Sequence, residues 1–192
     1  MVAAAFVVAA GAALPAPAVA APPTPKSKRI VAVVSIGGVK LGHSYAKALK
    51  TWGLGSTCAL DDQAYRDAHG GAELDRSDFT GVCSWRVDES VPTAGSASIV
   101  FDKGKVNEAS LRCAQDPATL EPNGRGPIGR FRLAKGKTKI GCGSTISKLV
   151  KTFPKAEPTP SGVALFQRDR MLSFGSAAGE VAGVALLYAK NY

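Results

Sequence analysis

Histidine and cysteine, the side chains that most often bind transition metals, are scarce in this chain. It has two histidines, His43 and His69, and four cysteines among its 192 residues. The cysteines are at least 25 residues apart, so the C-x-x-C spacing of structural zinc sites is missing. We therefore expect neither a metal site nor another cofactor.

The sequence also lacks the short motifs that mark common enzyme families. It has no G-x-S-x-G around a nucleophilic serine, no G-x-x-x-x-G-K-[ST] phosphate loop and no calcium-loop spacing of acidic residues. His43 and Ser44 are adjacent, but neighbours in sequence do not place a hydroxyl against an imidazole as a catalytic triad requires. These absences favour a non-catalytic protein, and an unrecognised secreted hydrolase is the alternative.

Charge is absent from the first 25 residues, which are rich in Ala and Val. The run leads into A-V-A at residues 18–20, a small-x-small cleavage pattern. We predict a signal peptide over residues 1–20 and a tether with proline and lysine over 21–29. Pro15 and Pro17 interrupt the apolar run, so we expect no stable membrane span. This interpretation predicts a secreted or cell-envelope protein outside the cytoplasm.

Export would place the four cysteines in an oxidising compartment, where an even number favours disulfides over a metal site. Four cysteines allow three pairings. We predict Cys58 with Cys83 and Cys113 with Cys142.

An internal repeat organises the rest of the chain. The segment 44–52, S-Y-A-K-A-L-K-T-W, returns as 145–153, T-I-S-K-L-V-K-T-F. Apolar residues fall at i, i+3, i+4 and i+7 in each copy, which is one stripe of a helix. Ser44 and Thr145 stand where they can cap the first turn. The sequence therefore predicts two matched helices.

The segments around the two helices predict the fold class. A β-branched run over 30–36 precedes the first helix. A strand over 81–88 and a hairpin over 98–106 are predicted after it, with a matching strand over 162–169 and a matching hairpin over 172–181, and Gly104 and Gly179 permit the two turns. We predict an α+β protein of two tandem units, each a strand, a helix and an antiparallel β-meander, with the helices packed on one face of the sheet. The units span 30–113 and 131–192, and a linker rich in Pro and Gly spans 114–130.

The charges are unevenly distributed. The net charge is +9, yet the first unit carries an acidic insert over residues 59–80 that has no counterpart in the second unit. Deletion of this insert is predicted to spare the fold, provided that Cys58 and Cys83 still meet or are replaced together. A basic patch is predicted around the second helix, with two readings: it binds an anionic cell-wall polymer, or it keeps a secreted protein soluble. The patch consists of Lys135, Lys137, Lys139, Lys148 and Lys151.

Several short motifs suggest a family. The pairs Leu41-Gly42 and Trp52-Gly53 flank the first helix, and F-D-K-G-K-V follows at 101–106. A weaker second set occurs at 140–141, 153–154 and 174–181. Over about 30–113 and 131–188, the chain resembles the β-lactamase-inhibitor-protein-like fold and the small outer-membrane assembly lipoproteins of the SmpA/OmlA type. That resemblance implies tandem units whose sheet exposes one face that grips another protein.

These observations together predict a non-catalytic, exported protein-binding module, inhibitory or associated with the envelope, whose partner is another extracellular or envelope protein. Nucleic acid is disfavoured as a partner because aromatic and basic residues are not interleaved. The contact surface is predicted on the solvent face of the sheet, beside the acidic insert. Its predicted members are Arg86, Asp88, Gln167 and Arg168.

Overall fold

The computed structural model of the 192-residue chain describes residues 25, 27–53, 58, 64, 67–71, 76–86, 94–124 and 126–191. The predicted signal peptide, part of the tether and much of the acidic insert lie outside these ranges. No helix within the described ranges has the length and apolar character that a membrane crossing needs.

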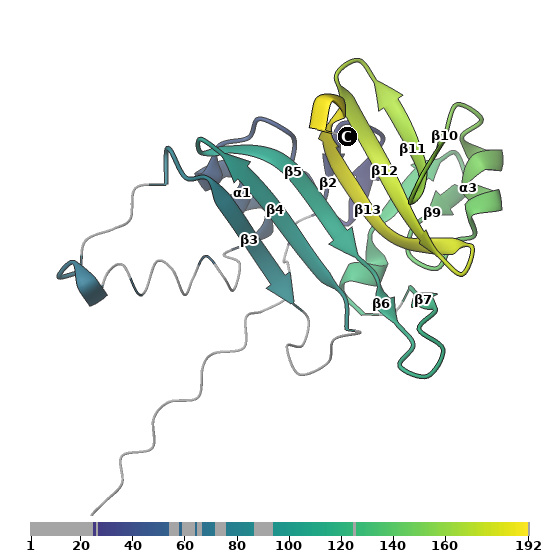
Figure 1. The fold of residues 1–192 in the computed structure, drawn as a ribbon, viewed down its shortest axis with the longest axis horizontal. Helices are drawn as coiled ribbons and strands as arrows, with labels where there is room; N and C mark the ends of the chain where they lie inside the picture. The colour runs from purple at the N-terminus through teal and green to yellow at the C-terminus, as the bar shows by residue number, and fades with distance from the viewer. Residues whose placement is uncertain are drawn as a thin grey trace, which may run out of the picture.

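The larger layer, as far as the chain is described, is a seven-stranded antiparallel sheet (Figure 1). Its strands are β3 (Gly81–Arg86), β4 (Ser96–Asp102), β5 (Lys105–Arg112), β10 (Glu157–Thr159), β11 (Gly162–Gln167), β12 (Arg170–Ala177) and β13 (Glu180–Tyr188). Their spatial order is β10-β11-β12-β13-β5-β4-β3. The meander β3–β5 therefore joins the meander β11–β13 through the neighbouring strands β13 and β5, where Leu186 lies opposite Ala109.

The described residues also form a four-stranded sheet made of two hairpins. Its strands are β1 (Arg29–Val31), β2 (Ser35–Ile36), β8 (Arg132–Lys135) and β9 (Thr138–Ile140), in the order β2-β1-β8-β9. The central strands β1 and β8 run parallel, with Ile30 opposite Leu133. In Figure 1 the seven-stranded sheet lies in front, and β2 lies behind it.

Both repeat copies form helices with the predicted caps: α1 (Tyr45–Trp52) and α3 (Ile146–Thr152). Ser44 Oγ accepts from the Lys47 N–H at 3.4 Å, and Thr145 Oγ1 accepts from the Lys148 N–H at 3.2 Å. The apolar stripes face inward in part, since Trp52 and Leu149 are fully buried whereas Val150 is exposed.

The predicted fold class is wrong. The protein is mostly β, with short helices and large antiparallel sheets, and it does not divide clearly into two strand–helix–meander units. The run predicted as one strand over 30–36 is a hairpin, because Val33 adopts a left-handed φ of 54° and the Val34 N–H donates to Val31 O. This turn places Ile30 opposite Ile36, so both side chains enter the core. Each of the two sheets therefore contains strands from both halves of the chain.

The predicted linker also has more structure than its composition indicated. It contains the strands β6 (Ala114–Gln115) and β7 (Pro122–Asn123) and a 3-10 turn, η1 (Ile128–Arg130). Ile128 is buried in the core. A further 3-10 turn, η2 (Ala189–Asn191), follows β13.

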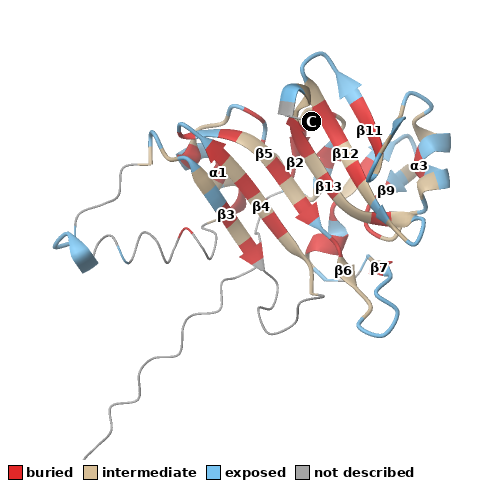
Figure 2. Ribbon diagram, in the orientation of Figure 1, coloured by how far each residue is buried: buried red, intermediate tan, exposed pale blue. Residues whose placement is uncertain are grey.

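A small buried cluster of Ala164, Met171 and Leu187 lies on the open side of the large sheet, and the main core lies between the two sheets and α1. The alternation of buried and intermediate residues is visible along the strands in Figure 2. Trp52 is its central side chain, because its ring lies edge-on to Trp85 at 5.4 Å and to Phe131 at 6.2 Å. These contacts join the helix, the large sheet and the segment before β8. Truncation of a buried aromatic of this kind typically costs about 3–5 kcal/mol.

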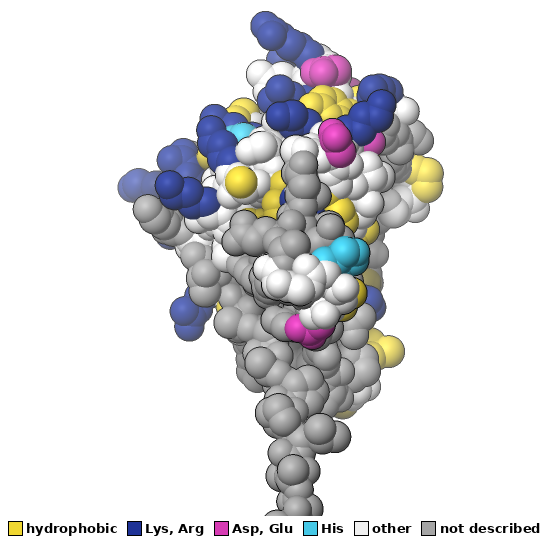
Figure 3. All heavy atoms as spheres, turned by 90° about the vertical axis from the view of Figure 1, so that its left-hand side faces the viewer, with side chains coloured by type: hydrophobic (Ala, Val, Ile, Leu, Met, Phe, Trp, Pro, Cys, Tyr) yellow, Lys and Arg dark blue, Asp and Glu magenta, His cyan; other side chains and the backbone are white. Residues whose placement is uncertain are grey.

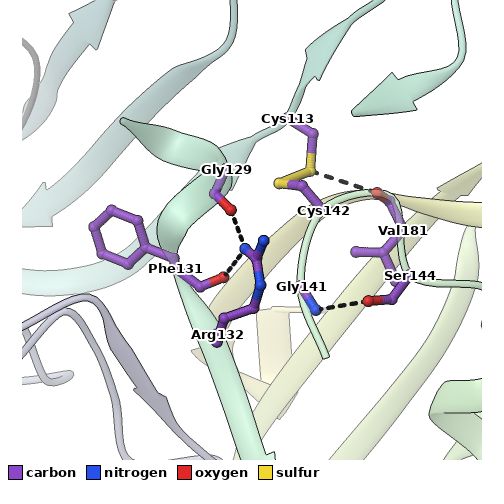
Figure 4. The surroundings of a disulfide bond; sticks show 8 residues. All are labelled: Cys113, Gly129, Phe131, Arg132, Gly141, Cys142, Ser144 and Val181. Carbon is purple, nitrogen blue, oxygen red and sulfur yellow. Dashed lines mark hydrogen bonds between the residues drawn. A yellow bond between two sulfur atoms is a disulfide. The ribbon is translucent and has the colours of Figure 1, made fainter. Parts of the chain in front are cut away.

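The two predicted disulfides are confirmed. Cys58 is bonded to Cys83 with a Cα–Cα distance of 5.3 Å, and Cys113 to Cys142 with 5.6 Å. Figure 4 shows the second bond beside Val181, whose carbonyl oxygen lies 3.5 Å from Cys113 Sγ. A disulfide sulfur carries no proton, so we read that distance as a contact. The bond ties the end of β5 to the segment that leads into α3.

Candidate binding surfaces

The face of the seven-stranded sheet that is turned toward the viewer in Figure 1 carries no second sheet or α-helix in the described residues, and we call it the open face. The 3-10 turn η2 covers part of it, because Ala189 packs against the buried side chains of Ala164, Met171 and Leu187. Side chains on it alternate with the buried side chains of the core. A row of small residues crosses it from strand to strand in register. The row consists of Ser84, Ser98, Ser110, Ala185, Ser173 and Ala164.

A second cross-strand row lies beside the row of small residues and is mainly apolar. It runs through Val82, Val100, Glu108, Leu187, Met171 and Phe166. The two end members are the most exposed of the row's apolar side chains, Val82 at 50% and Phe166 at 42%. In this row the exposed apolar side chains lie near the two edges of the sheet, whereas Met171 and Leu187 are buried. No sequence motif marks this face, although the alternation of Ser96 and Ser98 in β4 is a weak signal of it.

The four residues predicted for this surface do not lie together. Arg86 ends β3, where its backbone pairs with Ser96. Gln167 shares the register of Val163 and Leu165 and therefore belongs to the core-facing side of β11. Arg168 lies in the turn after β11 with a φ of 56°. Asp88 lies outside the described residues.

Three of the five predicted lysines meet at a second site. Lys135, Lys148 and Lys151 line a pocket of about 410 Å³ together with the hydroxyl side chains of Thr138 and Thr152. Lys135 Nζ also donates to the Thr152 carbonyl oxygen at 2.9 Å, which satisfies one acceptor at the end of α3. No carboxylate lines this pocket within the described residues. We call it the lysine pocket.

The other two lysines lie elsewhere. Lys139 lies opposite Ala134, so it projects from the other face of the small sheet than Lys135 and Thr138. Lys137 is in the turn between β8 and β9. Positive charge is also present far from the lysine pocket: Figure 3, which views the left-hand side of Figure 1, shows Lys and Arg side chains spread over the upper part of that face.

His43 and Ser44 have structural roles at the start of α1. Ser44 Oγ caps the helix, and His43 Nδ1 accepts from the Lys40 N–H at 3.5 Å. Burial lowers the pKa of His43, and the positive charges of Lys47 and Lys40 lower it further. A neutral imidazole that already accepts a backbone hydrogen bond does not activate the neighbouring hydroxyl.

Arg132 has a similar structural role near the second disulfide. Its guanidinium donates to the carbonyl oxygens of Gly129 and Phe131, as Figure 4 shows. Burial lowers its pKa. A Cβ atom on Gly141 would lie 2.8 Å from this guanidinium, so the packing requires glycine there.

No family model, curated protein or solved structure matches this chain. The resemblance drawn from the short motifs therefore stays a prediction. Within the described residues, no group of three or more His, Cys, Asp and Glu side chains has an arrangement suited to a metal ion.

Proposed function

We propose that this protein is an exported, non-catalytic binding module that grips another extracellular or envelope protein with the open face of its seven-stranded sheet. The two disulfides support export, because such bonds persist in oxidising compartments. The observation that carries the binding role is the face itself, where a row of small, partly exposed side chains runs in register from Ser84 in β3 to Ser173 in β12.

The size of the open face suits a protein partner. Seven strands spaced at about 4.8 Å give a width of about 30 Å, and strands of about six residues give a length of about 20 Å. The resulting area of about 600 Å² is close to the roughly 800 Å² that each partner buries in a standard interface. The rims and turns of the sheet supply the remainder.

The composition of the face also suits a protein partner. Ser98 and Ser110 have small side chains, and their hydroxyls are 2.8 Å apart, so one of them donates to the other. Desolvation of this pair on binding therefore costs less than desolvation of unpaired hydroxyls. Val82 and Phe166 provide apolar contact near opposite edges, and Arg112 and Glu108 in β5 provide charged contacts.

The proposal is tested by photo-crosslinking from the centre of the face. A benzophenone amino acid at position 110 is exposed to secreted and envelope fractions of the producing organism, and the same probe at position 139 serves as the control. We expect one crosslinked protein from position 110 and none from 139. Binding of that purified protein should be lost in Ser98→Arg and kept in Ser161→Arg, whose residue lies in the turn before β11. Equal binding by both variants would refute the proposal.

A second function is favoured by the lysine pocket: binding of an anionic cell-wall polymer. Three ammonium groups and the Thr138 hydroxyl around one cavity are complementary to phosphate or carboxylate groups, whereas the Thr152 hydroxyl already donates to the Lys148 carbonyl oxygen at 2.7 Å. Such contacts are exposed, so they should weaken steeply between low and physiological salt, where the screening length is about 8 Å.

The polymer function is tested with paired charge reversals. Lys148→Glu with Lys151→Glu should reduce binding to purified anionic cell-wall polymer by about tenfold at low salt. The control, Lys137→Glu with Lys139→Glu, changes the net charge equally but leaves the lysine pocket intact. Equal losses in both double variants would indicate that net charge alone drives adsorption.

A further inference from the structure

One edge of the large sheet is only half covered. The three residues of β10 pair with Gly162, Val163 and Ala164 of β11. The rest of β11, residues 165–167, extends beyond β10 and has no strand on that side in the described part of the chain. Residues 153–156 instead form a turn in which the Ala156 N–H donates to Phe153 O at 2.9 Å.

The main chain of Phe166 faces this free edge. Backbone groups alternate sides along an antiparallel strand. The Ser176 N–H donates to Ser161 O at 2.8 Å, so the odd-numbered residues of β11 direct their backbone groups toward β12. The even-numbered residues Gly162 and Ala164 then direct their backbone groups toward β10. The position of Pro158 agrees with this, because it lies opposite Val163, where no N–H is needed for the pairing of β10 with β11. The N–H and C=O of Phe166 consequently point outward without a strand partner.

A groove of about 490 Å³ opens beside this free edge. Val33, Phe153 and Leu165 give it an apolar lining. Phe166 also lines it, although the register of β11 places the Phe166 ring on the open face. Its charged lining residues are two cations, Lys135 and Lys155. The groove therefore combines an apolar cavity, positive charge and an unpaired strand edge.

We propose that an extended peptide segment of a partner protein binds here by adding a strand to β11. Its main chain pairs with the N–H and C=O of Phe166, a large apolar side chain enters the groove, and a neighbouring Asp or Glu faces Lys155 or Lys135. Strand addition supplies affinity through the backbone and specificity through alternate side chains. An amphiphilic anion would fit the cavity and the lysines, but it would not use the backbone pair of Phe166, which is why a peptide is the better occupant.

This edge site shares Phe166 with the open face but uses its main chain rather than its ring. The two proposals can still fail independently, because the edge is tested at the Phe166 amide and the open face is tested at Ser98 and Ser110. Short random peptides are displayed and selected on the full chain, and an enriched sequence is synthesised as the probe. We expect enrichment of large apolar residues at alternate positions with an adjacent Asp or Glu. Hydrogen exchange provides the direct readout: the Phe166 amide should exchange quickly in the free protein and slowly with the peptide bound, whereas the Leu165 and Gln167 amides are protected in both states.

Two substitutions of Phe166 distinguish the contribution of its backbone N–H to peptide binding from the contribution of its ring. Phe166→Pro removes the outward N–H without removing a hydrogen bond to β12, and Phe166→Ala keeps that N–H. Loss of the backbone bond should make Phe166→Pro bind the probe about tenfold more weakly than Phe166→Ala. Lys155→Glu should weaken binding of an acidic probe in a protein whose edge is intact, so the test does not depend on the proline variant folding.

Four outcomes would overturn the proposal. The first is failure to select any peptide, and the second is equal affinity of the proline and alanine variants for the probe. The third is a Phe166 amide that is protected in the free protein. The fourth is competition by dodecyl phosphate with unchanged exchange at Phe166, which would assign the groove to an amphiphilic anion.

Discussion

A Cβ atom on Gly104 would overlap the carbonyl oxygen of Ser77. Gly104 is the second residue of the tight turn between β4 and β5, and its φ is 66°. Its carbonyl oxygen accepts from the Tyr45 N–H at 2.9 Å, and its N–H donates to Phe79 O at 2.8 Å. The turn thus joins the start of α1 to the segment that ends the acidic insert.

The second half of the chain provides a matched control for this turn. Gly179 has a φ of 77° between β12 and β13, and its carbonyl accepts from the Ile146 N–H at 2.9 Å, but no atom lies within 4 Å of a Cβ built on it. Gly179→Ala should cost about 1 kcal/mol from the left-handed backbone alone. Gly104→Ala should cost at least about 2 kcal/mol more, because residues 76–79 must move. Urea denaturation measures both, and equal losses would contradict the close packing.

The acidic insert should be replaceable only up to residue 75. Residues after it are part of the fold, since the Phe79 ring lies 5.5 Å from Tyr45 and 5.9 Å from Phe101 and Thr80 Oγ1 accepts from the Lys103 N–H. Replacing residues 59–75 with Gly and Ser of the same number should leave the free energy of unfolding within about 1 kcal/mol. Extending the replacement through Thr80 should cost about 3 kcal/mol or more. Thermal unfolding followed by circular dichroism compares the two, and a stable longer replacement would support the original prediction for 59–80.

The protein should lose stability as the pH falls through the ordinary pKa of histidine. The pKa of His43 lies below its usual value of 6.5, so the unfolded chain takes up this proton first. The contribution of His43 to the free energy of unfolding is therefore complete above about pH 7.5. It decreases as the pH falls through about 6.5, until His43 is protonated in the folded state too. His43→Gln should remove this part of the pH dependence. Urea denaturation at both ends of that range measures it, with His69→Gln as the control, since an unchanged slope in the His43 variant would contradict the assignment.

Removal of the Cys113–Cys142 bond should show two effects of that disulfide: it lowers the entropy of the unfolded chain, and it holds the end of β5 against the segment before α3. Replacing both cysteines with Ala opens a loop spanning 29 residues, for which chain entropy predicts a loss of about 3.5 kcal/mol. The Cys58–Cys83 bond spans 25 residues and should cost nearly the same by this argument. Only the Cys113–Cys142 bond ties the end of β5 to the segment before α3. Its loss should therefore also raise hydrogen exchange at the amides of position 113 and Gly143, which donate to carbonyl oxygens of β13. Unchanged exchange there would show that the backbone alone holds this junction.

Local chemistry made the helices and disulfides predictable from sequence. The 3.6-residue spacing of apolar residues, with Ser44 and Thr145 before each stripe, is sufficient to specify two capped helices. The pairing of cysteines nearest in sequence was also correct. In each case the determining contacts lie within a short stretch of chain or a single loop.

The tertiary structure alone decided how the halves combine. The β-branched run over 30–36 favours an extended strand locally, yet burial of both Ile30 and Ile36 is achieved only when Val33 turns the chain with a positive φ. The pairing of β13 with β5 and of β1 with β8 depends on residues far apart in sequence, which no local pattern reports. The same pairings decide the sites: they align the serines of the open face, leave Phe166 on a free edge and send Lys139 to the other side of the small sheet from Lys135. Register across strands fixes the face that each side chain occupies, and register is set by the packing of the whole core.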